Sequence, residues 1–164
     1  TPSSSRWSAS PPASGDNYDL PGAWVGGSMD LRDHAETMSL DGRSGGAFIP
    51  GAERRRGHYF GLVPDLLISL HPDYVMTHLL TPLAADRTAI ECAWLFPEEA
   101  AQRAGFDPAY AVDFWDLTNR QDWAACESVQ RGLSSPPARP GPLAPDEDGV
   151  YQFVPRVARA YAGA

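Results

Sequence analysis

The feature that most constrains the fold is a long amphipathic segment at residues 107–133. Asp107 and Pro108 are typical of a helix start, because an aspartate caps free backbone N–H groups and a proline fits the first turn. The proline-rich stretch SPPARPGPLAP then ends the segment. Spacings of three and four residues define one face that should turn toward the core, formed by Val112, Trp115, Asn119, Asp122, Cys126, Val129 and Leu133. The pattern predicts a helix over residues 108–133.

Two polar residues interrupt this face at its centre, Asn119 and Asp122. A buried carboxylate is costly unless a cation or hydrogen-bond donors meet it. From the residues alone, Asp122 could pair with an arginine, cap a neighbouring loop or bind a metal ion. Asn119 lies one helical turn earlier, and two polar groups on an inward face indicate a polar cavity.

The region before this helix is typical of strands. It is rich in aromatic, β-branched and leucine residues that partly alternate with polar ones, and AADR forms a turn. We predict strands near residues 58–63, 65–71, 73–82 and 87–96, with the last two paired as an antiparallel hairpin. After the long helix, a shorter one is expected with Val150, Phe153, Val154, Val157 and Tyr161 on one face. The order predicts an α+β fold in which an antiparallel β-sheet wraps around a long C-terminal helix.

The first part of the chain has a different composition. Residues 1–57 are rich in Ser, Gly and Pro, so we expect an irregular, loop-rich and poorly buried N-terminal segment. Residues 58–164 would then hold the sheet and the C-terminal helices. The chain opens on Thr1, not Met, which favours an N-terminally truncated or processed chain.

Charge and cysteine content narrow the function. The 164 residues carry 21 acidic and 13 basic residues, a net charge of −8, which argues against nucleic acid as a partner. No apolar run is long enough to span a membrane. Cys92 and Cys126 lie far apart and form no metal or redox motif, so we expect reduced thiols in a cytoplasmic protein.

Two stretches of the sequence resemble a known family. The run NRQDWAACESVQRGLSS, with LLISLHPDYVMTHLLTPLAADRT upstream, is similar to the catalytic domain of Rieske-type non-haem iron oxygenase α subunits. These are aromatic-ring-hydroxylating dioxygenases and related monooxygenases and demethylases that act on quaternary ammonium compounds. The resemblance covers residues 14–162. It implies the helix-grip fold shared with START and Bet v 1-like domains.

The resemblance also implies a chemistry. In that family two histidines and one carboxylate hold a mononuclear Fe(II) beside the sites for O₂ and a small organic substrate. The matching carboxylate here is Asp122, with Asn119 beside it, and Asp116 is the competing candidate. The full protein would be a homo-oligomer, a trimer, that receives electrons from a reductase or ferredoxin through a 2Fe–2S cluster in an upstream domain.

The chain departs from the family at the other ligands. The family's E-x-x-x-x-H-x-x-x-x-H segment is absent, and so is the C-x-H…C-x-x-H motif of the Rieske cluster. Of the four histidines, His71 and His78 are seven residues apart and are expected on opposite strand faces. None is assigned to iron. The sequence is therefore interpreted as the C-terminal catalytic part of an oxygenase α subunit without its Rieske domain, inactive as a fragment.

Four aromatic residues are candidates for the substrate pocket: Phe60, Trp94, Phe114 and Trp115. Such rings suit an aromatic compound, and they also suit a quaternary ammonium ion through cation–π contacts. The alternative function is a metal-free helix-grip domain that binds a lipid or another hydrophobic ligand. Asp122 separates the two, since an apolar cavity has no use for an unpaired carboxylate.

Overall fold

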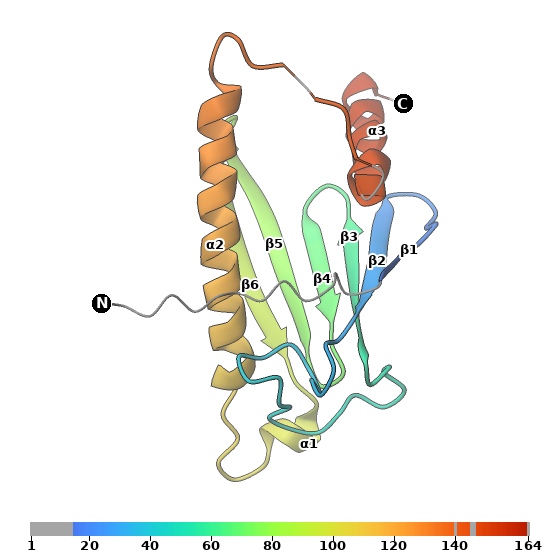
Figure 1. Cartoon of the computed structure of the whole chain (residues 1–164), viewed down its shortest axis with the longest axis vertical. Coiled ribbons are helices and arrows are strands. Elements are labelled where there is room, and N and C mark those ends of the chain that lie inside the picture. The colour runs from blue at the N-terminus through green and yellow to red at the C-terminus, as the bar shows by residue number, and fades with distance from the viewer. Residues whose placement is uncertain (1–14, 140, 145–146, 164) are drawn as a thin grey trace, which may run out of the picture.

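The computed structural model describes residues 15–139, 141–144 and 147–163, and these form an antiparallel sheet followed by helices (Figure 1). The six strands found there are β1 (Gly15–Asn17), β2 (Trp24–Asp30), β3 (Arg56–Leu62), β4 (Leu66–Leu70), β5 (Val75–Ala84) and β6 (Arg87–Leu95). They lie in the sheet in chain order, each antiparallel to the next. The fold is α+β, as predicted.

The helices follow the sheet. They are α1 (Glu98–Ala101), α2 (Ala109–Leu133) and α3 (Asp148–Ala162). Figure 1 shows α2 running alongside β5 and β6, while α3 lies near β2, toward the opposite edge of the sheet. The backbone N–H of Ala109 donates to the Asp107 carboxylate at 2.9 Å, as a start at Asp107-Pro108 predicts. The long helix and the shorter one are both confirmed, although Val150, Phe153, Val154 and Tyr161 of α3 are exposed. None of the described helices has both the length and the apolar character needed to cross a membrane.

The predicted hairpin is β5 and β6. Their register runs from Val75 opposite Leu95 to Pro82 opposite Thr88, with an irregularity between Pro82 and Ala84. Because successive strand residues face opposite sides, Met76 and His78 of β5 share a face with Cys92 and Trp94 of β6. This is the inner face, on which α2 packs.

The N-terminal segment is more ordered than predicted. Within the described part of residues 1–57, β1 and β2 belong to the sheet, and β2 pairs with β3 from Trp24–Leu62 to Asp30–Arg56. The expectation of an irregular segment is wrong there. Gly26 and Gly27 have no side chains, so the sequence of β2 lacks the alternation of apolar and polar residues by which a strand is predicted. A Cβ on Gly27 would lie 2.7 Å from the Asp16 carbonyl oxygen of β1, so the close approach of these strands requires glycine. Residues 1–14 lie outside the described residues.

Residues 31–55 connect β2 to β3 without a helix or strand. They are not poorly buried throughout, because Leu31, Thr37 and Ser39 are buried. The core itself lies between α2 and the sheet and is centred on Tyr74, Met76, Ala111 and Trp115. The first half of α2 is therefore the half that packs.

Candidate functional site

Asn119 is the buried polar residue at the centre of α2, with 5% of its surface exposed. Its Oδ1 lies 3.1 Å from Nε2 of His78 on β5. An amide oxygen only accepts, so this contact places a proton on Nε2 of His78. The Asn119 Nδ2 donates to Sγ of Cys92 on β6 at 3.7 Å, and burial raises the pKa of the Cys92 thiol. The polar position predicted from the helix pattern thus has partners on two strands.

Trp115, one turn before Asn119, is fixed by a chain of hydrogen bonds. Its Nε1 donates to the Tyr74 hydroxyl at 2.7 Å, and that hydroxyl donates to the Met38 carbonyl at 2.6 Å. Burial is the main cause that raises the pKa of Tyr74 far above its ordinary value, so the hydroxyl stays protonated and remains a donor. The chain of bonds joins α2 to the segment between β2 and β3.

Asp73 anchors the same segment to the start of α2. The side chain is 1% exposed, and it accepts hydrogen bonds from three hydroxyl groups, those of Thr37, Ser44 and Tyr110, at 2.5, 2.7 and 2.8 Å. Burial, followed by the bond to Asp73, raises the pKa of Tyr110 well above its ordinary range. The carboxylate is therefore stabilised by hydroxyl donors, and these contacts fix the base of α2.

His71 lies in the same packed region, at the turn between β4 and β5. Its ring is 1% exposed and contacts Tyr59, Tyr74 and Trp115, with centroids 5.8, 4.6 and 5.5 Å apart. Neither ring nitrogen has a hydrogen-bond partner among the described residues. Burial, with a smaller contribution from His58, lowers the pKa of His71 to about 3. The imidazole is therefore neutral at physiological pH.

The expectation that His71 and His78 face opposite sides is wrong. Both rings contact Trp115, at centroid distances of 5.5 and 6.3 Å. The strand alternation does not extend from one to the other, because residues 71–74 form the connection between β4 and β5. His78 is the residue that sequence reasoning missed, although its alternation with Met76 on β5 could have placed it on the inner face.

The candidate pocket residues do not all meet. Trp94 and Phe114 pack against the core cluster that contains Trp115. Phe60 lies on the other face of the sheet, where it stacks with Tyr18 and His58 at centroid distances of 5.8 and 6.4 Å. Placing Phe60 in the same pocket was wrong, because its neighbour Tyr59 is the β3 residue that faces inward. The other three rings form packed core in the described chain.

Asp122 is exposed, and no hydrogen bond or ion pair to it is found among the described residues. The expectation that it points into a cavity is wrong for this structure. The buried positions of α2 advance by four residues, from Ala111 to Trp115 to Asn119, and the half-buried residue that follows is Trp123. Asp122 lies one position before Trp123, and one position corresponds to a rotation of about 100° around a helix, so its side chain points away from the buried face.

The predicted inward face is also exposed beyond Asp122. Cys126 is exposed, and Val129 and Leu133 are 58% and 61% exposed. In the described part of the chain these three side chains therefore lie largely in solvent, although Trp123 and Gln130 of the same half are half-buried. Asp116, the competing carboxylate, accepts a hydrogen bond from Nε of Arg120 at 2.8 Å on the helix surface. Of the two aspartates, Asp122 is thus the one whose carboxylate is not engaged within the described chain.

The described residues do not by themselves fit a mononuclear iron site. Within residues 15–139, 141–144 and 147–163, no group of three or more His, Cys, Asp or Glu side chains is arranged to hold a metal ion. A two-histidine, one-carboxylate set needs three converging donors, and Asp122 offers one. His78 is engaged with Asn119 and His71 is enclosed by aromatic rings.

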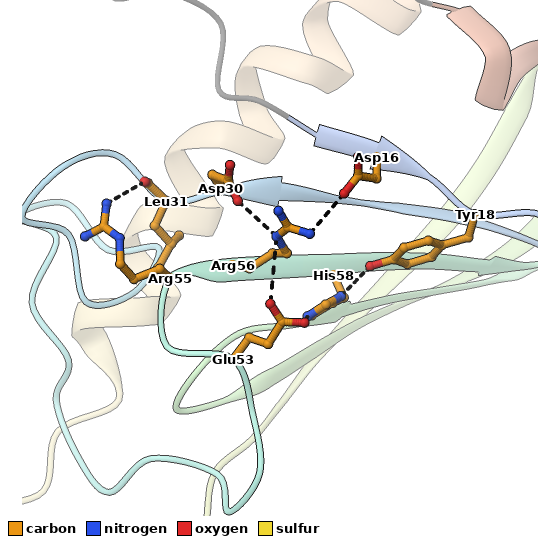
Figure 2. A network of polar contacts seen from close by, with 8 residues as sticks. All are labelled: Asp16, Tyr18, Asp30, Leu31, Glu53, Arg55, Arg56 and His58. Atoms are coloured by element: carbon orange, nitrogen blue, oxygen red, sulfur yellow. Dashed lines mark hydrogen bonds and ion pairs between the residues drawn. The ribbon is translucent and has the colours of Figure 1, made fainter.

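A second polar network lies at β1–β3, away from α2 (Figure 2). The Arg56 guanidinium donates to Asp30 at 2.9 Å and to Asp16 at 3.0 Å, and lies 3.9 Å from Glu53. Beside it, the Tyr18 hydroxyl and Nδ1 of His58 are 2.6 Å apart. These contacts join β1, β2 and β3, which explains why the N-terminal strands stay in the sheet.

Comparison with known proteins identifies the class. The sequence profile of the ring hydroxylating alpha subunit (catalytic domain) family matches residues 2–163, and the chain belongs to this family. It is also similar to the glycine betaine monooxygenase oxygenase subunits of Pseudomonas aeruginosa strains UCBPP-PA14 and PAO1. Each is 29% identical over 138 residues, which cover 77% of this chain and 30% of the relative. The chain thus spans less than a third of the length of these relatives.

Proposed function

We propose that this chain is the C-terminal part of the catalytic domain of a Rieske-type oxygenase α subunit, which hydroxylates a small organic substrate with O₂. The family match over residues 2–163 carries the proposal. As an oxygenase of this family, the full protein would take electrons from a reductase or ferredoxin through a 2Fe–2S cluster outside this chain.

Asp122 is the residue proposed to supply the carboxylate to a mononuclear Fe(II). It opens the run DWAACESVQRGL, which carries the family resemblance, on α2. Its carboxylate is not engaged in the described chain, unlike that of Asp116. Asn119, held by His78 and Cys92, lies one turn before it and would fix the rotation of the helix. The two histidine ligands would come from residues outside this chain.

The experiment compares two variants of the full protein. Asp122→Asn should remove mononuclear iron and hydroxylation while leaving the visible absorbance of the Rieske cluster unchanged. Asp116→Asn is the matched control on the same helix, and it should keep both iron and activity. Iron content per subunit and O₂ uptake measure the outcome. Full iron content and activity in Asp122→Asn would show that another carboxylate binds the metal.

For the substrate, we propose a quaternary ammonium compound of the betaine type. The relatives are described as glycine betaine monooxygenases, and this class was one of the two left open by the aromatic residues. Hydroxylation of an N-methyl group gives a product that releases formaldehyde. Formaldehyde formation from glycine betaine, coupled to O₂ uptake, therefore supports the proposal. Turnover of an aromatic acid without turnover of any trimethylammonium compound would contradict it.

A further inference from the structure

The face of the sheet opposite α2 is apolar over much of its width. Successive residues of a strand face opposite sides, and Met76 and Trp94 face α2, so their strand neighbours face away from it. The register aligns these neighbours in rows across β4, β5 and β6. We call the large apolar residues of these rows the outer sheet face: Leu66, Ile68, Leu70, Val75, Leu79 and Leu95.

The sequence of β4, LLISL, shows this feature most clearly. An antiparallel strand with one side in water normally alternates between apolar and polar residues. In β4 the outward positions are all apolar, whereas its polar residue, Ser69, pairs with Met76 on the side of α2. In the rows that pass through β4, the polar residues of β5 and β6 on the outer side are Thr77 and Glu91. This pattern is typical of a sheet that is covered on both sides.

The described part of the chain leaves the outer sheet face open. None of its residues is buried, and Leu79 and Leu95 are 43% and 55% exposed. Met76, on the opposite side of β5, is 0% exposed. The chain does cover the outer side of the sheet at β3, where the Tyr18 ring stacks on Phe60 at a centroid distance of 5.8 Å. The cover that begins over β3 is therefore incomplete over β4, β5 and β6.

Two observations indicate what completes this cover. The outer sheet face carries no charged side chain, and a contact that is mainly apolar is typical of permanent packing rather than of transient association. The glycine betaine monooxygenase relatives also extend well beyond this chain, because the matched part is 30% of their length. More of the same polypeptide is therefore available to pack on this face in a full-length protein of this kind.

We propose that the outer sheet face is covered in the full-length protein by an apolar helix or strand that the same polypeptide supplies from outside this chain. This covering segment continues over β4, β5 and β6 the contact that Tyr18 makes over β3. Its presence follows from the sheet register and from the length of the relatives, so it does not depend on the proposed iron site.

Thiol labelling of the full-length protein tests this cover. Leu79→Cys places a thiol on the outer sheet face, and Leu83→Cys is the matched control near the turn of the same hairpin. In the described chain the two leucines are 43% and 54% exposed. In the native full-length protein the thiol at position 79 should react with a maleimide about tenfold more slowly than the thiol at position 83, after the wild-type reaction of the native cysteines is subtracted. Similar rates at the two positions would overturn the proposal.

A measurement without substitution covers the case in which Leu79→Cys does not fold. Hydroxyl-radical footprinting of the wild-type full-length protein, read by mass spectrometry, compares the same side chains. Leu79 and Leu95 should be oxidised much less than Leu83. Similar oxidation of the three leucines would contradict the proposed cover.

Photo-crosslinking identifies the segment that covers the face. A benzophenone amino acid at position 95, on the edge strand β6, should link to a residue outside residues 1–164, in a product with the mass of one subunit. A product with the mass of two subunits would assign the face to a second copy of the protein. That result would overturn the proposal, and so would a failure to link any residue outside this chain.

Discussion

His71 should make the folded protein sensitive to mild acid. The ring is buried and its pKa falls from 6.5 to about 3 on folding, so between these values the unfolded chain binds more protons than the folded one. Stability therefore falls as the pH falls through this range. Between pH 7 and pH 5 the folded state stays neutral at His71 while the unfolded state becomes protonated. This difference lowers the free energy of unfolding by about 2 kcal/mol.

Urea denaturation followed by tryptophan fluorescence at the two pH values measures this loss. His71→Phe keeps an aromatic ring but cannot be protonated, so the variant should lose about 2 kcal/mol less than the wild type between pH 7 and pH 5. His34→Asn is the control, because His34 is exposed and asparagine tolerates its left-handed backbone, with φ of 69°. This control should keep the wild-type pH dependence. His71→Asn provides a second variant if the phenylalanine is too large. If neither His71 variant reduces the loss, the reasoning is refuted.

Two further predictions concern the buried hydroxyl groups around the base of α2. Asp73→Asn should lower the free energy of unfolding by about 3 kcal/mol, because an amide nitrogen cannot accept the hydroxyl hydrogen bonds made to one of the two carboxylate oxygens. Asp41→Asn, at an exposed carboxylate, should cost much less in the same urea titration. Stability should also fall as the pH rises above about 10, because burial raises the pKa of Tyr59 to about 12 and that of Tyr74 and Tyr110 further, so the folded state holds protons that the unfolded state releases. A stability that stays constant from pH 9 to pH 11 would contradict this assignment.

The elements that the sequence predicted well are those whose signal is local. The long helix has a periodic face with a capping residue and a proline stop, and the structure places it at Ala109–Leu133. The hairpin of β5 and β6 alternates clearly along the chain. β2 was missed because two glycines occupy its centre, and glycine carries no hydrophobic pattern. Its place in the sheet depends on pairing with β3, which lies some thirty residues later.

The site was predicted less completely than the fold. If a residue's position along a strand or helix is predicted wrongly by one, its side chain is expected in the wrong direction. On a strand each step reverses the face, so Phe60 and Tyr59 point to opposite sides of β3 and composition does not tell them apart. On a helix each step turns the side chain by about 100°, which separates the half-buried Trp123 from the exposed Asp122. Asn119 was identified correctly as a polar inward position. Its partner His78 lies 41 residues away, and only the packing of α2 on the sheet brings the two together.

The two halves of α2 differ in a way that bears on the proposed function. Three side-chain hydrogen bonds fix the first half to the rest of the fold. They join Tyr110 to Asp73, Trp115 to Tyr74, and Asn119 to His78. Asp122 follows three residues after the last of these contacts, a rise of about 4.5 Å along a helix. A helix that is held up to Asn119 therefore leaves the Asp122 backbone little freedom in position, although the exposed side chain makes no hydrogen bond or ion pair in the described chain. A carboxylate with a fixed backbone and no internal partner is suited to bind a group supplied from outside this chain, as the proposed iron site requires.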